Sequence, residues 1–204
     1  MEKNNPKLSL DGLFRQNIVL MSGLVTAPII VAATTAERAL VLTISFLMIS
    51  YTSILICRFI PRKILYALRV LIYTAVASVM FIPTALLTNA LFPEAASGCM
   101  IYIEVLVVNS LLLAKTESRF YLEPYGIMAA DALIYTLGYA MAAFAVGILR
   151  ELLAYGSLFG ARLFSPVMPA AKTPFFGFIL LGILAAVCRA VAHRKPHTEK
   201  AGEA

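Results

Sequence analysis

The sequence predicts an all-α protein that crosses a membrane several times. No charged residue occurs in the stretches 16–36, 39–57 and 70–93. Hydrophobic residues make up 61% of the 204 residues and charged residues 14%, whereas a soluble domain carries about a quarter charged residues. About 20 apolar residues in a helix cross a hydrocarbon layer about 30 Å thick. Because lipid offers the backbone no hydrogen-bond partner, these stretches are predicted to be helices.

The first three predicted helices cover residues 16–35, 39–57 and 65–92. An acidic and a basic residue form a tight turn after the first helix, and a group of basic residues follows the second. The third ends before Pro93, because a proline cannot continue a helix begun upstream without losing a hydrogen bond.

The last three predicted helices cover residues 98–114, 125–149 and 174–191, which makes six transmembrane helices in all. The apolar run of the fourth is cut short by Glu104. The segment 155–173 is apolar but rich in glycine and proline, and no part of it is long enough to span. We expect it to be a re-entrant or surface-lying connection.

The distribution of lysine and arginine predicts the orientation. If the amino terminus is cytoplasmic, 13 of the 17 basic residues fall on the cytoplasmic side and 4 on the other. Cytoplasmic loops carry the excess of Lys and Arg, so both termini are predicted to be cytoplasmic.

The predicted helices divide into two groups of three. We expect a cytoplasmic amino-terminal segment over 1–15, a membrane domain over 16–192 and a cytoplasmic basic tail over 193–204. The membrane domain contains two repeats, of about 16–93 and 98–192. An odd number of spans in each repeat inverts the second relative to the first.

The first helix of each predicted repeat is unusual. Helix 16–35 carries Gly23 and Pro28 near its middle, and helix 98–114 contains Glu104. Interrupted segments in matching positions point to a functional centre near the bilayer midplane. The alternative is that Pro28 is an ordinary kink and that Glu104 lies near the outer interface.

A few polar side chains in apolar surroundings are candidates for an ion path or for subunit contacts: Glu104, Asn109, Asp131, Arg150 and Glu151. An ionisable group in a membrane helix is costly, so it should face the protein interior, a partner or water. Each also has a structural alternative. Glu104 could form an ion pair, and Asn109 could hold two helices together. Asp131 could be stabilised by a nearby helix amino terminus, and the Arg150–Glu151 pair could be a solvated helix end.

The sequence lacks recognisable catalytic equipment. It has no phosphate-binding glycine loop, no Ser-His-Asp set, and histidines only at 193 and 197 in the basic tail. The three cysteines at 57, 99 and 188 match no metal-binding spacing, and there is no soluble basic face for nucleic acid. We expect no catalytic residue and no metal site in this chain alone.

Three segments resemble a known family. GILRELLAYGSLFG at 147–160, Gly23-Leu24 with Ala27-Pro28, and IYIEVLVVNSLLLAKTES at 101–118 are similar to segments of the small six-helix membrane subunits of the Rnf electron-transport complex and of the sodium-translocating NADH:quinone reductase (Nqr). The predicted orientation favours the E-type Rnf or D-type Nqr subunit over the oppositely oriented sibling.

The resemblance implies a cofactor that this chain is not equipped to hold. In the family, such a subunit and its sibling each supply two cysteines, and the four thiolates hold an iron-sulfur centre within the membrane. Electrons pass through this centre between flavins of other subunits. Here the two cysteine positions are occupied by Ala27 and Ser110. Because such clusters are normally held by thiolates, we expect no cofactor bound by this chain alone.

The resemblance implies a subunit of an ion-translocating electron-transport complex in a bacterial inner membrane, divergent in lacking cluster ligands. Its expected partners are membrane lipid, the oppositely oriented sibling and the flavin-bearing subunits. The alternative is a small-solute transporter or substrate-capture subunit on the same inverted-repeat scaffold, with the intramembrane polar residues lining a pocket.

Overall fold

The structure is a computed structural model that describes residues 17–108, 110–120 and 123–193. Most of these residues are helical, and the strands among them form one two-stranded hairpin, which confirms the all-α membrane class. Four helical segments among them are long and apolar enough to cross a membrane: Ala36–Cys57, α4 (Tyr66–Leu91), α7 (Tyr125–Tyr155) and Pro174–Val191 within α8 (Pro174–His193). The segment Ala36–Cys57 consists of α2 (Ala36–Phe46), a π-helical turn η2 (Leu47–Tyr51) and α3 (Thr52–Cys57).

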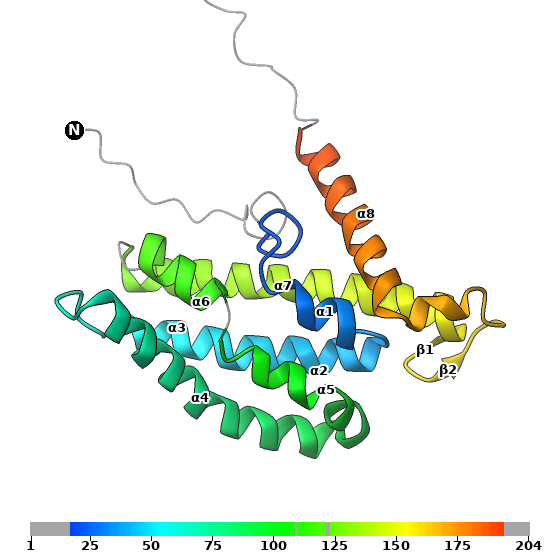
Figure 1. Cartoon of the computed structure of the whole chain (residues 1–204), viewed down its shortest axis with the longest axis horizontal. Helices are drawn as coiled ribbons and strands as arrows, with labels where there is room; N and C mark the ends of the chain where they lie inside the picture. Colours follow the sequence, from blue (N-terminus) through cyan, green and yellow to red (C-terminus); the bar gives the residue numbers. More distant parts are fainter. Residues whose placement is uncertain (1–16, 109, 121–122, 194–204) are drawn as a thin grey trace, which may run out of the picture.

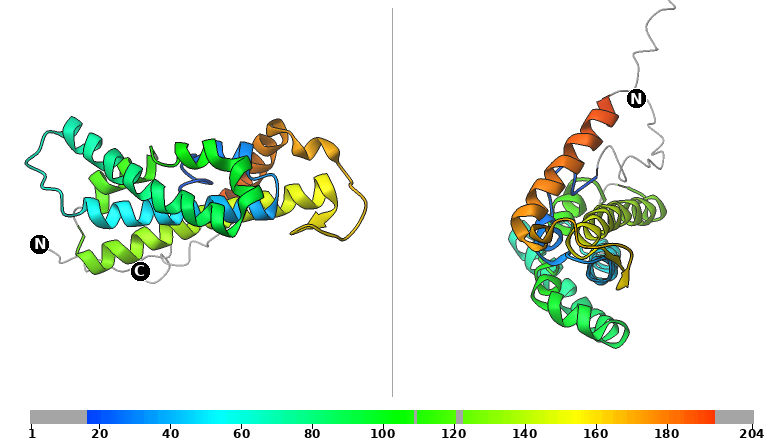
Figure 2. Two further views of the ribbon diagram at one scale, coloured as in Figure 1. Left: turned by 90° about the horizontal axis from the view of Figure 1, so that it is seen from below. Right: turned by 90° about the vertical axis from the view of Figure 1, so that its right-hand side faces the viewer.

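The segment Ala36–Cys57 and α7 form the centre of the molecule. They are 50% and 61% buried over their apolar windows, against 22% for α4 and 17% for α8. The ring of Phe46 in α2 stacks on that of Tyr139 in α7, with 4.0 Å between the centroids. Figure 1 shows α2 and α7 running side by side, whereas α8 leaves the other helices at a steep angle, as Figure 2 also shows.

A small residue allows α2 and α7 to approach closely. A Cβ atom placed on Gly147 of α7 would lie 2.6 Å from the Cβ of Ala39 and 2.9 Å from the carbonyl oxygen of Thr35. Close approach at small residues is a common way for membrane helices to associate, because lipid removes the hydrophobic drive that operates in water.

The first predicted helix is not continuous, which corrects the expectation of a helix over 16–35. Only α1 (Thr26–Ala32) is helical, and turns precede it. Gly23 and Val25 have φ of 67° and 56°, in the left-handed region that a right-handed helix cannot include. Pro28 is the third residue of α1, where its missing N–H removes no helical hydrogen bond. The break therefore lies before Pro28, not at it.

The non-helical backbone before α1 is held by Asn17. Its side-chain oxygen accepts hydrogen bonds from the backbone N–H groups of Val19 and Leu20, and its Nδ2 donates to the carbonyl oxygen of Gly138 at 2.9 Å. Asn17 is completely buried, and Gly138 lies near the middle of α7. Irregular backbone at membrane depth is tolerated where protein groups satisfy it, and Asn17 supplies such groups.

The fourth predicted helix is also divided. It begins earlier than expected, as α5 (Pro93–Val105), because a proline is well suited to the first helical position. Hydrogen bonds of the tighter i→i−3 type then end it at Val107 and Val108, and α6 (Ser110–Lys115) follows. Glu104 lies within α5, so it does not interrupt the helix; the break follows it. Since the first segment holds one short helix and the fourth is divided into two, the count of six crossings stays a prediction.

The remaining connections agree with the sequence in outline. A π-helical turn, η3 (Thr116–Phe120), follows α6, and α7 extends six residues beyond its predicted end at 149. Segment 155–173 does not span: it holds a hairpin, β1 (Ser157–Leu158) with β2 (Ala161–Arg162), and a 3₁₀ turn η4 (Pro169–Lys172). Gly156 ends α7 with φ of 65°, and a Cβ there would lie 2.1 Å from the carbonyl oxygen of Phe164.

Candidate functional site

The side chain of Arg150 joins two chain segments that meet at one end of the molecule. It is completely buried near the carboxyl end of α7. Nη1 donates to the carbonyl oxygens of Ile30 and Ala33 at 2.7 and 3.2 Å, where α1 ends. The other guanidinium nitrogens donate to η4 and the residue after it, with acceptors Ala171 (3.0 Å), Lys172 (2.9 Å) and Thr173 (3.2 Å).

This arrangement suits a guanidinium because its donors lie in one fixed plane. The last carbonyl groups of a helix have no helical partner and carry partial negative charge, so a cation is favourable beside them. Gly177 of α8 completes the packing, because a Cβ there would lie 2.5 Å from the carbonyl oxygen of Ile30 and 3.3 Å from Nη1 of Arg150. Arg150 thus fixes the outgoing end of α1 against α7, η4 and α8.

Glu151 stabilises the start of the next helix, α2. Its Oε2 accepts a hydrogen bond of 2.7 Å from the backbone N–H of Ala36, the first residue of α2. Its Oε1 accepts from the Ser157 hydroxyl and the Gly160 N–H, both at 3.2 Å. An anion is favourable at a helix amino terminus, so adjacent opposite charges on α7 satisfy the end of α1 and the start of α2.

We call Arg150 and Glu151 together the α7 clamp. Both side chains are buried, and the hydrogen bonds named above all go to groups of this chain. The sequence marked this pair as a candidate subunit contact, and its partners could not be predicted because most are backbone atoms more than 20 positions away. Through these contacts, the clamp positions the broken first segment.

The structure describes two of the other candidate residues, and these lie on different helices. Glu104 is exposed on α5, Asp131 is buried in α7, and Asn109 lies outside the described residues. Within the described residues there is no group of three or more His, Cys, Asp or Glu side chains that could hold a metal ion. The use of these residues as an ion path stays a prediction.

The positions that resemble cluster ligands lie next to the two breaks. Ala27 is the second residue of α1 and Ser110 is the first of α6. A methyl group and a neutral hydroxyl are not donors for an iron-sulfur cluster, which takes thiolates. The free cysteines lie elsewhere: Cys57 ends α3, Cys99 lies within α5 and Cys188 lies in α8. The residues present therefore do not fit the group that the resemblance implies.

A second charged cluster was not found from the sequence. Arg69 of α4 forms a two-pronged salt bridge with Glu117 of η3, with Nε and Nη2 at 2.9 and 2.8 Å from the carboxylate oxygens. The Tyr73 hydroxyl donates to the same carboxylate at 2.7 Å, and Arg62 donates to the Glu117 carbonyl oxygen. Burial raises the pKa of Glu117, but hydrogen bonds from Arg69 and Tyr73 outweigh it and hold this pKa below its ordinary value.

Comparison with known proteins agrees with the resemblance. A family model described as "Rnf-Nqr subunit, membrane protein" matches residues 6–185. A relative from Pseudoalteromonas atlantica, named as the E subunit of an ion-translocating oxidoreductase complex, is 30% identical over 162 residues. The matched residues cover 77% of this chain and 68% of that relative.

Two further relatives carry the same name. That of Yersinia pseudotuberculosis is 28% identical over 75% of this chain and 66% of its own length. That of Rhodobacter capsulatus is 23% identical over 98% of this chain and 89% of its own. The family model spans all the helical segments up to the middle of α8. The chain belongs to the Rnf-Nqr family of membrane subunits.

Proposed function

We propose that this protein is the E-type membrane subunit of an Rnf-like ion-translocating oxidoreductase complex. The observation that carries the proposal is the matched pair of interrupted segments, one before α1 and one between α5 and α6, in a chain that belongs to this family. Interruptions at corresponding positions of two halves are typical of membrane proteins that act near the bilayer midplane.

The proposed setting is the inner membrane of a bacterium, with both chain ends in the cytoplasm. The excess of 13 basic residues over 4 on the proposed cytoplasmic side supports this orientation. The helical segment 36–57 and α7 would then cross in the interior, with α4 and α8 toward the outside of the subunit.

The proposed partners are an oppositely oriented sibling and the flavin-bearing subunits of the complex. The low burial of α4 and α8 supports this, because their apolar side chains need lipid or protein beside them. Within the complex, this chain contributes a scaffold and no cluster ligand, because Ala27 and Ser110 replace the two thiols. Glu104, Asn109 and Asp131 are its proposed contribution to an ion path.

The test is purification of the affinity-tagged full chain from its native membrane in mild detergent. We expect membrane and flavin-bearing subunits of an oxidoreductase to copurify in fixed ratio, with flavin fluorescence in the same fraction. Recovery of a stable chain without partners would contradict the proposal. If that lone chain also catalysed saturable solute uptake in liposomes, the transporter alternative would replace it.

A further inference from the structure

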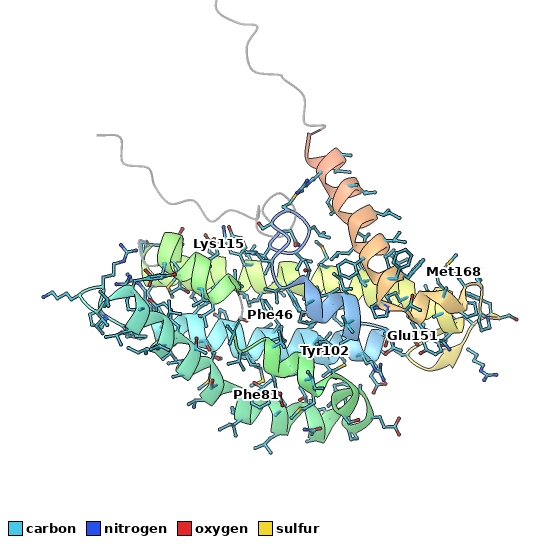
Figure 3. The ribbon with its side chains drawn as sticks, viewed as in Figure 1. Phe46, Phe81, Tyr102, Lys115, Glu151 and Met168 are labelled. Carbon is cyan, nitrogen blue, oxygen red and sulfur yellow. The ribbon has the colours of Figure 1, made fainter. Side chains whose placement is uncertain are left out.

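A cavity lies at the end of the molecule where α7 ends and α8 begins. It has a volume of about 620 Å³, and its lining includes Tyr155, Ser157, Arg162, Phe164 and Lys172. Figure 3 shows Glu151 and Met168 at this same end. The cavity lies in the connection between two candidate membrane spans, so in a membrane it would lie near the boundary between hydrocarbon and water.

The cavity walls are fixed by the α7 clamp. Arg150 holds the carbonyl oxygen of Lys172, and Glu151 holds the hydroxyl of Ser157 and the N–H of Gly160. The two sides of the cavity are thus attached to the same turn of α7. A ligand entering it would find walls that are already in position.

The cavity contains two positive charges, those of Arg162 and Lys172. In the part of the chain that the structure describes, neither side chain forms a salt bridge. Nζ of Lys172 lies 4.3 Å from the centroid of the Tyr155 ring. Glu151, the carboxylate beneath the hairpin, already accepts three hydrogen bonds from other groups. An anionic ligand with several acceptor oxygens, such as a phosphodiester, matches these two cations.

Two large apolar side chains, Leu163 and Phe164, line the same cavity. The segment 159–168 exposes five such side chains to between 42% and 67%: Phe159, Leu163, Phe164, Val167 and Met168. A large exposed apolar surface marks a binding surface for lipid or protein. A soluble acidic peptide would leave this surface in water. A phospholipid presents both an anionic phosphate and acyl chains, and it matches both features.

We propose that this cavity binds an anionic phospholipid, with its phosphate between Arg162 and Lys172 and its acyl chains against Leu163 and Phe164. The site lies on the leaflet predicted to be external. The proposal is independent of the oxidoreductase complex, because it uses only residues of this chain.

The test is native mass spectrometry of the purified full chain, titrated with phosphatidylglycerol and, separately, with zwitterionic phosphatidylcholine. We expect one tight phosphatidylglycerol per chain and at least about tenfold weaker binding of phosphatidylcholine, because the choline cation beside its phosphate is repelled by the two basic side chains and such like-charge juxtaposition is costly. The double variant Arg162→Gln/Lys172→Gln should weaken phosphatidylglycerol binding by at least about tenfold, since loss of one charged hydrogen bond already accounts for that factor.

The matched control is Arg62→Gln/Lys63→Gln, which removes two exposed basic residues from the loop before α4. It should leave the tight site unchanged. Equal affinity in the wild type and the Arg162/Lys172 variant would overturn the proposal, as would an equal loss in the control. If glycerol phosphate displaced bound phosphatidylglycerol as effectively as free phosphatidylglycerol does, the site would be one for a soluble anion, and the proposal would be overturned.

Folding is checked by thermal unfolding of each variant. Arg162 and Lys172 are exposed, so their replacement should leave the melting temperature unchanged. If the double variant unfolds, the single variants Arg162→Gln and Lys172→Gln make the same test, each with a smaller expected loss. Phe164→Asn should weaken lipid binding without affecting binding of glycerol phosphate.

Discussion

Arg150 concentrates long-range hydrogen bonds on a single side chain. Its five acceptors belong to two separate segments of the chain, and all are carbonyl oxygens. Removing the guanidinium would leave these buried acceptors unpaired, and burying unpaired polar groups is more costly than losing the bonds themselves. The residue therefore acts chiefly on the position of α1 and η4.

We predict that Arg150→Met lowers the stability of the protein strongly, by at least about 3 kcal/mol, since hydrogen bonds to charged groups contribute about 1.5–3 kcal/mol each. Arg150→Lys should recover only part of this, because an ammonium cannot face all five acceptors. The measurement is thermal unfolding in detergent. Lys63→Met, at an exposed position, is the control, and an equal melting temperature for Arg150→Met and the control would contradict the role given to the clamp.

The stability of the protein should depend on pH through the ionisation of Glu117. Its pKa is lowered in the folded protein, so its contribution to stability is complete above the unfolded pKa, about 4.3, and is lost as the pH falls through the lower folded value. Melting temperatures of the wild type and of Glu117→Gln should therefore differ at neutral pH and converge as the pH falls through the lowered folded pKa. A difference that stays constant from neutral to acid pH would contradict the ion pair with Arg69.

Between elements, the contact of α2 with α7 depends on a glycine. Gly147→Ala places a methyl group where the Cβ of Ala39 lies only 2.6 Å away, so the helices must separate. We expect a loss of about 1–3 kcal/mol, the usual cost of overpacking. Gly182→Ala on α8 is the control, because nothing lies within 4 Å of its added Cβ. Thermal unfolding should show destabilisation at 147 and none at 182; equal effects would contradict the close approach.

The sequence predicted some elements well because their signals are local. Charge groups and prolines delimit α4, α7 and α8, and the structure agrees with their predicted starts within one residue. The sequence did not predict where the first segment breaks, because hydropathy carries no information about backbone conformation. Val25 is apolar and nevertheless adopts a left-handed φ. The hydrogen bond from Asn17 to Gly138 in the middle of α7 likewise could not be predicted from the sequence.

The candidate site was predictable only in part. The density of specific residues at 147–160 drew attention to Arg150 and Glu151, and both are buried in the clamp. Their function as helix-end partners depends on backbone atoms of distant segments, which a single sequence cannot pair. The Arg69–Glu117 salt bridge, between residues 48 positions apart, was missed for the same reason.

For the molecule as a whole, the orientation gives a direct prediction. In a background without native cysteines, Lys3→Cys and Lys200→Cys should be shielded from a membrane-impermeant maleimide added to intact cells, because both ends are proposed to be cytoplasmic. Arg162→Cys in the hairpin should react. Permeabilised cells supply the control, since all three sites should then be labelled. Labelling of the two chain ends from opposite sides would contradict six crossings and the inverted repeat.

This member of the Rnf-Nqr family has two interrupted segments, with Ala27 and Ser110 beside the breaks. The most direct test is the iron content and visible absorption of the copurified complex, measured for the wild type and for Ser110→Ala. Because this chain is proposed to ligate no cluster, the iron per complex should be the same in both. A stoichiometric loss of iron and of the cluster absorption on Ser110→Ala would contradict a scaffold role without cluster ligands.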